Sequence, residues 1–294
     1  MRRIIIVVGL MLLAAVPRPA RAGVPPVHFH LHDQAAEPTA RVCARVWRQR
    51  GAELADQLLP VAVIPDTVHC FLLPSAEFQR QFGRRLPDWG VGVALAPGRV
   101  VALDHERILA VGPGPEVVFL HEMTHALLFQ GAGEARLPTW LHEGAAMRAS
   151  GQWRFTDTVS MVLEGRPPSL DSLQGAFPRG TGAADRAYRT SLLAVTWLER
   201  EHGPGAVPRI VAAGRRTGDF RAGFIAATGE QPETFASRFA GAMRLRYGWF
   251  LLIFRWPTLF VIMGLVFAAG AIRKIVIMKR SLREPEDPPG PPLP

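Results

Sequence analysis

Two histidines of this chain lie four residues apart, and a glutamate directly follows the first of them: His121, Glu122 and His125. Positions four apart share one face of a helix, so both imidazoles can bind the same metal ion there. A carboxylate at the position of Glu122 can accept a proton from water that the metal activates. The pentad therefore predicts zinc-dependent hydrolysis, although a five-residue pattern of this kind also arises by chance.

The residues around the pentad predict a buried helix. Helix-breaking residues, Gly112–Pro115, come first, and proline is favoured at the first helical position. An almost unbroken apolar run then extends through Phe129 to Gly131, where glycine is typical of a helix end. A helix that is apolar on all sides lies inside a protein, so histidines on it need partners.

A catalytic zinc site needs a third protein ligand, and the segment 137–150 offers two candidates. Pro138 is suited to open a helix there, and a short glycine-containing turn would bring this helix back against the pentad. Glu143 lies 18 positions after His125 (143 − 125), and His142 is its neighbour. Adjacent residues point about 100° apart on a helix, so only one of the two can reach the metal.

The pentad followed by Trp140-Leu141-x-Glu143-Gly144 resembles the gluzincin metallopeptidases, in particular the peptidase MA-like families of bacterial envelopes. The resemblance extends from about 61 to 248. It implies a zincin-like fold, Zn²⁺ as the cofactor, Glu143 as the third ligand and Glu122 as the general base. It also implies that the substrate is a peptide or protein of the cell envelope.

A carbonyl oxygen that becomes negatively charged also needs a hydrogen-bond donor. By the same resemblance this donor is often a tyrosine or a histidine, and the chain has only two tyrosines, Tyr188 and Tyr247. Tyr247 adjoins an apolar C-terminal segment, so Tyr188 is the candidate catalytic residue; a buried aromatic with a satisfied hydroxyl is the alternative. The chain also departs from better-known gluzincins, because Met147 stands where an acid would orient a metal-binding histidine.

Residues 1–22 have the pattern of a secretory signal peptide. Arg2 and Arg3 precede an apolar stretch at 4–16 that is too short to span a membrane comfortably. An Ala-x-Ala sequence at 20–22 then offers a cleavage site. We expect residues 23–248 to form an exported catalytic domain; an uncleaved N-terminal anchor is the alternative.

A second apolar segment, 249–272, predicts one transmembrane helix. Arg255 and Pro257 interrupt it, and tryptophans at its start suit a membrane interface. Five basic residues follow between 273 and 283, and the positive-inside rule places such a flank in the cytoplasm. We expect a single-pass protein of the bacterial inner membrane, with its catalytic domain in the periplasm and a basic, Pro-rich cytoplasmic tail at 273–294.

The two cysteines, Cys43 and Cys70, both lie in the segment expected to be exported. A disulfide between them is predicted for an oxidising compartment, and two buried thiols are the alternative. The formal net charge is +9, almost entirely because of arginine. Export and the lack of a nucleic-acid-binding sequence motif argue against a nucleic-acid partner. We expect some attraction to anionic lipid headgroups instead.

Strand-like segments precede the pentad and helical segments follow it, which predicts an α+β fold. The expected strands are 61–64, 68–73, and a hairpin of 91–95 with 99–103. The expected helices, besides the two around the pentad and Glu143, are 39–59, 75–83, 187–202, 204–213, 219–227 and 232–247.

The gluzincin resemblance also implies that an edge strand binds the substrate as an added strand, and 99–103 or its neighbour is the candidate. A membrane-tethered interaction module, zinc-binding or metal-free, is the alternative function. The intact Glu122 argues against it, because a purely structural site needs no general base. Structural zinc is also usually closed by four protein ligands, and the motifs supply three.

Overall fold

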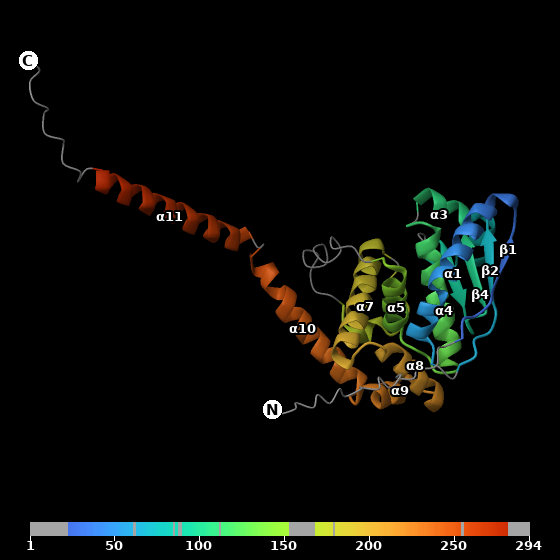
Figure 1. The fold of residues 1–294 in the computed structure, drawn as a ribbon. Coiled ribbons are helices and arrows are strands. Elements are labelled where there is room, and N and C mark those ends of the chain that lie inside the picture. The colour runs from blue at the N-terminus through green and yellow to red at the C-terminus, as the bar shows by residue number, and fades with distance from the viewer. Residues whose placement is uncertain are drawn as a thin grey trace, which may run out of the picture.

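The computed structural model shows a body of one sheet and several helices, from which the C-terminal helix projects (Figure 1). The described residues are 23–60, 63–84, 86–87, 90–111, 113–152, 168–178, 180–253 and 256–281. The predicted signal peptide and the part of the predicted tail from residue 282 onward lie outside the described residues.

The sheet has four strands in the order β1-β2-β4-β3. These are β1 (Val27–Leu31), β2 (Val68–Leu73), β3 (Gly92–Leu95) and β4 (Val100–Asp104). β1, β2 and β4 run parallel, and β3 runs antiparallel to β4. The β3–β4 connection is the predicted hairpin, with Gly98 at a φ of 92°. A Cβ there would lie 2.2 Å from the Ala126 oxygen, so glycine lets the turn meet the helix behind it.

Helices cover both faces of the sheet because side chains alternate along its strands. The helices are α1 (Glu37–Leu58), α2 (Ser75–Phe82), α3 (His105–Val111) and α4 (Pro115–Ala132). On β2, Cys70 and Leu72 belong to the main core with α1 and α4, whereas Phe71 and Leu73 belong to a smaller cluster with α2. This is the period of two that a strand imposes.

The described residues of the second half of the chain are mostly helical. Before the C-terminal helix they form α5 (Thr139–Ser150), α7 (Thr181–His202), α8 (Ala206–Thr217), α9 (Phe220–Thr228) and α10 (Pro232–Ile253). Two short 3-10 helices, η1 (Gln34–Ala36) and η2 (Leu170–Leu173), complete the described elements. The buried ring of Phe235 joins these helices, with centroids 5.9 Å from Trp140, 5.0 Å from Trp197 and 5.4 Å from Phe224.

The helix that carries the pentad is the centre of the fold. α4 begins at Pro115 and ends before Gly133, which has a φ of 62°. It contacts α1, α5, α8 and the β3–β4 hairpin. Its buried residues lie on all sides, which confirms the prediction of a buried helix.

The predicted α+β class is confirmed, and so are the hairpin and the helices predicted before and after the pentad in the sequence. β1 and α3 were not predicted. The strand predicted at 61–64 is wrong for its described residues, 63–64, which belong to no strand. Instead, the outer neighbour of β2 in the structure is β1 (Val27–Leu31), which comes before α1 in the chain.

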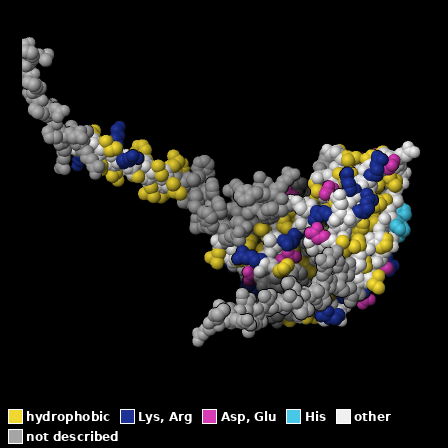
Figure 2. Space-filling model, in the orientation of Figure 1, with side chains coloured by type: hydrophobic (Ala, Val, Ile, Leu, Met, Phe, Trp, Pro, Cys, Tyr) yellow, Lys and Arg dark blue, Asp and Glu magenta, His cyan; other side chains and the backbone are white. Residues whose placement is uncertain are grey.

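Among the described residues, one helical segment, Phe260–Lys279, is long and apolar enough to cross a membrane. It belongs to α11 (Trp256–Ser281), and its apolar side chains are exposed (Figure 2). The predicted span of 249–272 overlaps this segment, which begins and ends further along the chain. α10 continues to Ile253, and α11 begins at Trp256 with Pro257 in its first turn, where a helix tolerates proline.

Cys43 in α1 and Cys70 in β2 are both buried and both free thiols, so the predicted disulfide is not formed in the structure. Burial raises the pKa of the Cys43 thiol to about 12, against the opposing effect of a backbone hydrogen bond. Burial, and then the charge of Cys43, also raises the pKa of Cys70. Both thiols are protonated at neutral pH, as expected for inert buried cysteines.

Candidate metal centre

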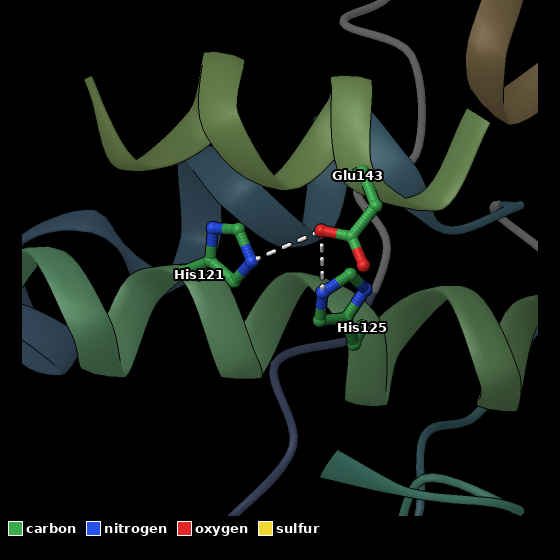
Figure 3. A group of neighbouring side chains, drawn as sticks. All are labelled: His121, His125 and Glu143. Atoms are coloured by element: carbon green, nitrogen blue, oxygen red, sulfur yellow. Dashed lines mark ion pairs between the residues drawn. The ribbon is translucent and has the colours of Figure 1, made fainter. Parts of the chain in front are cut away.

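Three side chains from two helices point at one another (Figure 3). α4 carries His121 and His125 one turn apart, and α5 carries Glu143 across from them. Oε2 of Glu143 lies 3.3 Å from Nε2 of His121 and 3.6 Å from Nε2 of His125. One ligand atom from each residue lies within 4.8 Å of the others, as in a group that can hold a metal ion.

Close packing between α5 and α7 holds Glu143 in this position. Gly144 follows Glu143 in the chain, and a Cβ on it would lie 2.2 Å from the backbone oxygen of Ser191 and 2.6 Å from the Val195 side chain. Only glycine permits such an approach without a backbone shift. The glycine beside the candidate ligand therefore has a packing role, which brings α5 between α4 and α7.

The distances in this group fit tetrahedral zinc. Zinc–ligand bonds of about 2.0–2.1 Å place neighbouring ligand atoms of a tetrahedron about 3.3 Å apart. The two nitrogen–oxygen separations, 3.3 and 3.6 Å, are close to that value. Oε2 of Glu143 is buried and accepts no hydrogen bond from a described residue, and a cation beside it would remove the cost of this burial. The residues fit zinc, and three ligands leave a position open for water.

The protein groups alone keep Glu143 ionised. Burial raises the pKa of its carboxyl, but the nearby imidazoles, His125 first and then His121, outweigh burial and hold this pKa well below its usual range. For His125, burial lowers the pKa, while the charge of the neighbouring Glu143 carboxylate produces a net upward shift. A carboxylate that is ionised at neutral pH is available as a metal ligand.

Glu122 lies beside the three ligand residues, and β3 passes close to it. The residue is only 7% exposed. Burial raises the pKa of its carboxyl, against the lowering effects of His121 and His125 and of a hydrogen bond from the Ala94 backbone. Gly92 makes the approach of β3 possible, because a Cβ there would lie 2.7 Å from Cγ and Oε1 of Glu122. A buried carboxyl with a raised pKa beside a metal group is suited to accept and return a proton.

His142, the other candidate for third ligand, is not part of the group of ligand atoms. Its ring packs against Phe129, with centroids 4.8 Å apart, and against His125, with centroids 5.6 Å apart. Burial, and then the charge of His125, lowers the pKa of His142 to about 3. This imidazole is therefore neutral, and α5 directs Glu143 rather than His142 at the histidine pair.

Tyr188 lies on α7, on the wall of the same cleft as the candidate ligands. Its ring meets that of Phe177 edge-on, with centroids 5.0 Å apart. Burial raises the pKa of the phenol strongly, and the charges of Glu143 and Glu122 raise it further. The phenol is therefore a proton-bearing donor at any ordinary pH. Tyr188 therefore lies close enough to the Glu143 and Glu122 carboxylates for their charges to shift its pKa.

The candidate metal centre opens into a cleft of about 910 Å³. Residues of β3 and of the segment before it form one wall, from Val91 through Ala94. The cleft carries charges of both signs, from Glu134 and Asp185 and from Arg136 and Arg189. It is therefore large enough for several residues of a peptide and is not dominated by one sign of charge.

The structure also decides which strand has an open edge at the cleft. β4 (Val100–Asp104), which corresponds to the first candidate for an added substrate strand, lies between β2 and β3 and has no free edge. Its neighbour β3 is one of the two edge strands, β1 being the other, and β3 lines the cleft. The sequence placed Ala94 only in the predicted hairpin strand, 91–95. Gly92 lies in the same strand and also ends a Pro87-Asp88-Trp89-x-x-Gly92 stretch that belongs to the gluzincin resemblance.

No described acid orients His121. Nδ1 of His121 is buried and has no hydrogen-bond partner among the described residues. Met147, at the position where the gluzincin resemblance calls for an acid, lies on α5 and lines the cleft. In the family that the sequence resembles, this second interaction orients the imidazole.

Comparisons with known proteins do not identify the chain: no family model matches it, and no curated protein matches it. The geometry of the site is therefore what indicates a function.

Proposed function

We propose that this chain is a membrane-anchored zinc metallopeptidase of the gluzincin type, with a zincin-like catalytic domain. The observation that carries the proposal is the convergence of His121, His125 and Glu143 beside a buried Glu122 in an open cleft. A structural zinc site is usually closed by four protein ligands and has no use for a general base. Three ligands and an adjacent carboxyl are typical of hydrolytic catalysis.

Zinc would be held by Nε2 of His121, Nε2 of His125 and the Glu143 carboxylate, and would supply a Lewis acid that makes water acidic near neutral pH. Glu122 accepts the proton of this water and delivers it to the leaving nitrogen. The Tyr188 hydroxyl donates a hydrogen bond to the substrate carbonyl oxygen as negative charge develops there. The raised pKa of Tyr188 supports this role, because the phenol keeps its proton.

The edge strand supports a peptide substrate. β3 lines the cleft beside Glu122 and pairs with β4 on only one side. An extended peptide can pair with the other side and so present a backbone carbonyl to the site. Main-chain pairing of this kind accepts many sequences, which supports a peptide or protein of the cell envelope as the substrate.

The location of the domain is part of the proposal. The apolar segment Phe260–Lys279 would anchor the chain as a single membrane span. Basic residues at and beyond the end of this segment favour a cytoplasmic C-terminus, by the positive-inside rule. The catalytic domain then faces the periplasm of a bacterial inner membrane, in agreement with the signal-peptide pattern at 1–22.

Metal analysis of the detergent-solubilised full chain tests the ligand set. We expect one equivalent of zinc in the unmodified chain and far less in Glu143→Ala. Glu134→Gln is the matched control, because Glu134 lines the same cleft but is not in the ligand group, and it should keep its zinc. Equal zinc contents in the unmodified chain and Glu143→Ala would show that Glu143 is not a ligand.

Hydrolysis of dye-labelled casein by the same preparations tests the general base. Glu122→Gln should keep one equivalent of zinc and lose turnover by about 10²–10⁴-fold, the usual contribution of a positioned proton acceptor. Unchanged hydrolysis in Glu122→Gln would exclude that role.

A further inference from the structure

Four of the nine histidines lie together far from the pentad in sequence: His28 and His30 on β1, His32 directly after it, and His69 on β2. Figure 2 shows histidine side chains gathered on the surface where Figure 1 places β1. His28, His30 and His32 are exposed, and His69 is half-buried. A different face of the molecule thus carries a second concentration of imidazoles.

The strand pattern places three of these histidines on one face of the sheet. On β1, Phe29 packs against Phe119 of α4, so His28 and His30 on either side of it point away from α4. On β2, His69 precedes the fully buried Cys70 and points the same way as the β1 histidines. The sheet therefore separates this group from the helix that carries the candidate metal centre.

The register of the strands brings the three rings next to one another. His28 and His69 are directly paired across β1 and β2, and their rings meet edge-on with centroids 5.6 Å apart. Nε2 of His30 lies 2.9 Å from Nδ1 of His69. The ring of Phe71 stacks on that of His30, with centroids 4.6 Å apart, and orients it.

We propose that His28, His30 and His69 form a surface site for a divalent late first-row transition-metal ion, with Cu²⁺ bound most tightly. Imidazole nitrogens suit copper, nickel and zinc, whereas calcium and magnesium require oxygen ligands. The nitrogens of His30 and His69 share one proton at 2.9 Å, and a metal ion takes its place. The third nitrogen would come from His28, whose exposed ring lies 5.6 Å from that of His69 (centroid to centroid) and must rotate toward the other two.

A merely solvated strand face does not account for this choice of residues. The chain has 34 Lys and Arg and 25 Asp and Glu but only nine His, yet these three adjacent positions of the sheet are all histidine. Over β4, the same outer face is covered by Phe78 and Phe82 of α2. Over β1 and the start of β2 the same face carries the histidines, and the hydrogen-bonding partner of His30 is another imidazole.

Copper binding to the full chain in detergent tests the site. A His121→Ala/His125→Ala background removes the imidazole pair on α4, and CuCl₂ is then titrated calorimetrically. We expect one equivalent of Cu²⁺ to bind and its electron paramagnetic resonance spectrum to show nitrogen ligands. Adding His30→Gln and His69→Gln should weaken binding by about tenfold or more, or about 1.4 kcal/mol.

His32→Gln is the matched control, because it removes a neighbouring exposed histidine and leaves the three proposed ligands in place. It should bind copper as the background chain does. Unchanged copper binding after His30→Gln/His69→Gln would overturn the proposal, and so would an equal loss in His32→Gln. If the background variant does not fold, the unmodified chain should bind two equivalents and His30→Gln/His69→Gln one; two equivalents in both would overturn it.

Discussion

Alanine in place of Gly92 should move the proposed general base without disturbing the metal ligands. A Cβ at this position would lie 2.7 Å from Cγ and Oε1 of Glu122. Because nonbonded carbon atoms normally approach to about 3.5–4.0 Å, the Glu122 side chain must withdraw by roughly 1 Å. A misplacement of about 1 Å can cost about 10²-fold in rate, which corresponds to about 2.7 kcal/mol in the activation barrier.

The fold should tolerate this substitution. Gly92 is not among the glycines with positive φ, so alanine can adopt its backbone conformation. Replacing glycine at such a position stabilises a protein by about 0.4–1 kcal/mol, because it lowers the conformational entropy of the unfolded chain. This gain offsets part of the cost of the local crowding. Glu122 is not one of the three ligand residues, so zinc content should also be unchanged.

The assay compares casein hydrolysis, zinc content and thermal unfolding of Gly92→Ala with those of the unmodified chain. Gly175→Ala is the control, because a Cβ on Gly175 would meet nothing within 4 Å. We expect only the rate to fall, and only in Gly92→Ala. Full activity in Gly92→Ala would refute the reasoning, and so would a fall in rate that is accompanied by loss of zinc or of thermal stability.

Further predictions concern the core, the thiols and the phenol. Phe235→Ala should lower the free energy of unfolding by about 3–5 kcal/mol, because its buried ring contacts three other helices; thermal unfolding in detergent measures this. With its pKa raised to about 12, Cys43 should be protonated at pH 8 and react with iodoacetamide only after denaturation; no alkylation of the denatured, unreduced chain would instead reveal a disulfide. Tyr188→Phe should keep zinc and lower kcat by about 10²–10³-fold, as removal of one oxyanion donor does; an unchanged kcat would assign Tyr188 a packing role.

Some elements could be predicted because their signal is local. The breaker residues before Pro115 and the apolar run after it were sufficient for α4. The turn at Pro97-Gly98 was sufficient for the β3–β4 hairpin. β1 was missed because its apolar residues alternate with histidines, although the same alternation is a strand pattern. α3 follows β4 without an intervening loop, and so no break in the sequence marks its start.

The metal group shows the same division between local and long-range information. The spacing of His121 and His125 follows from the helical period, so the sequence alone determined that both imidazoles share one face. The identity of the third ligand, by contrast, did not follow from spacing along one helix. Glu143 and His142 are adjacent, so their spacing left both available, and only the gluzincin resemblance favoured Glu143. The packing of α5 between α4 and α7 directs Glu143 at the pair.

The sequence by itself thus determined the types of residue, the helix of the pentad, the α+β class and the presence of a long apolar C-terminal segment, since each depends on neighbours within a few turns of one element. Only the tertiary structure decided that Glu143 rather than His142 meets the histidine pair, that β3 rather than β4 has the open edge beside Glu122, and that His28, His30 and His69 meet. These are contacts between elements, and their geometry depends on how helices and strands pack rather than on the spacing of residues along the chain.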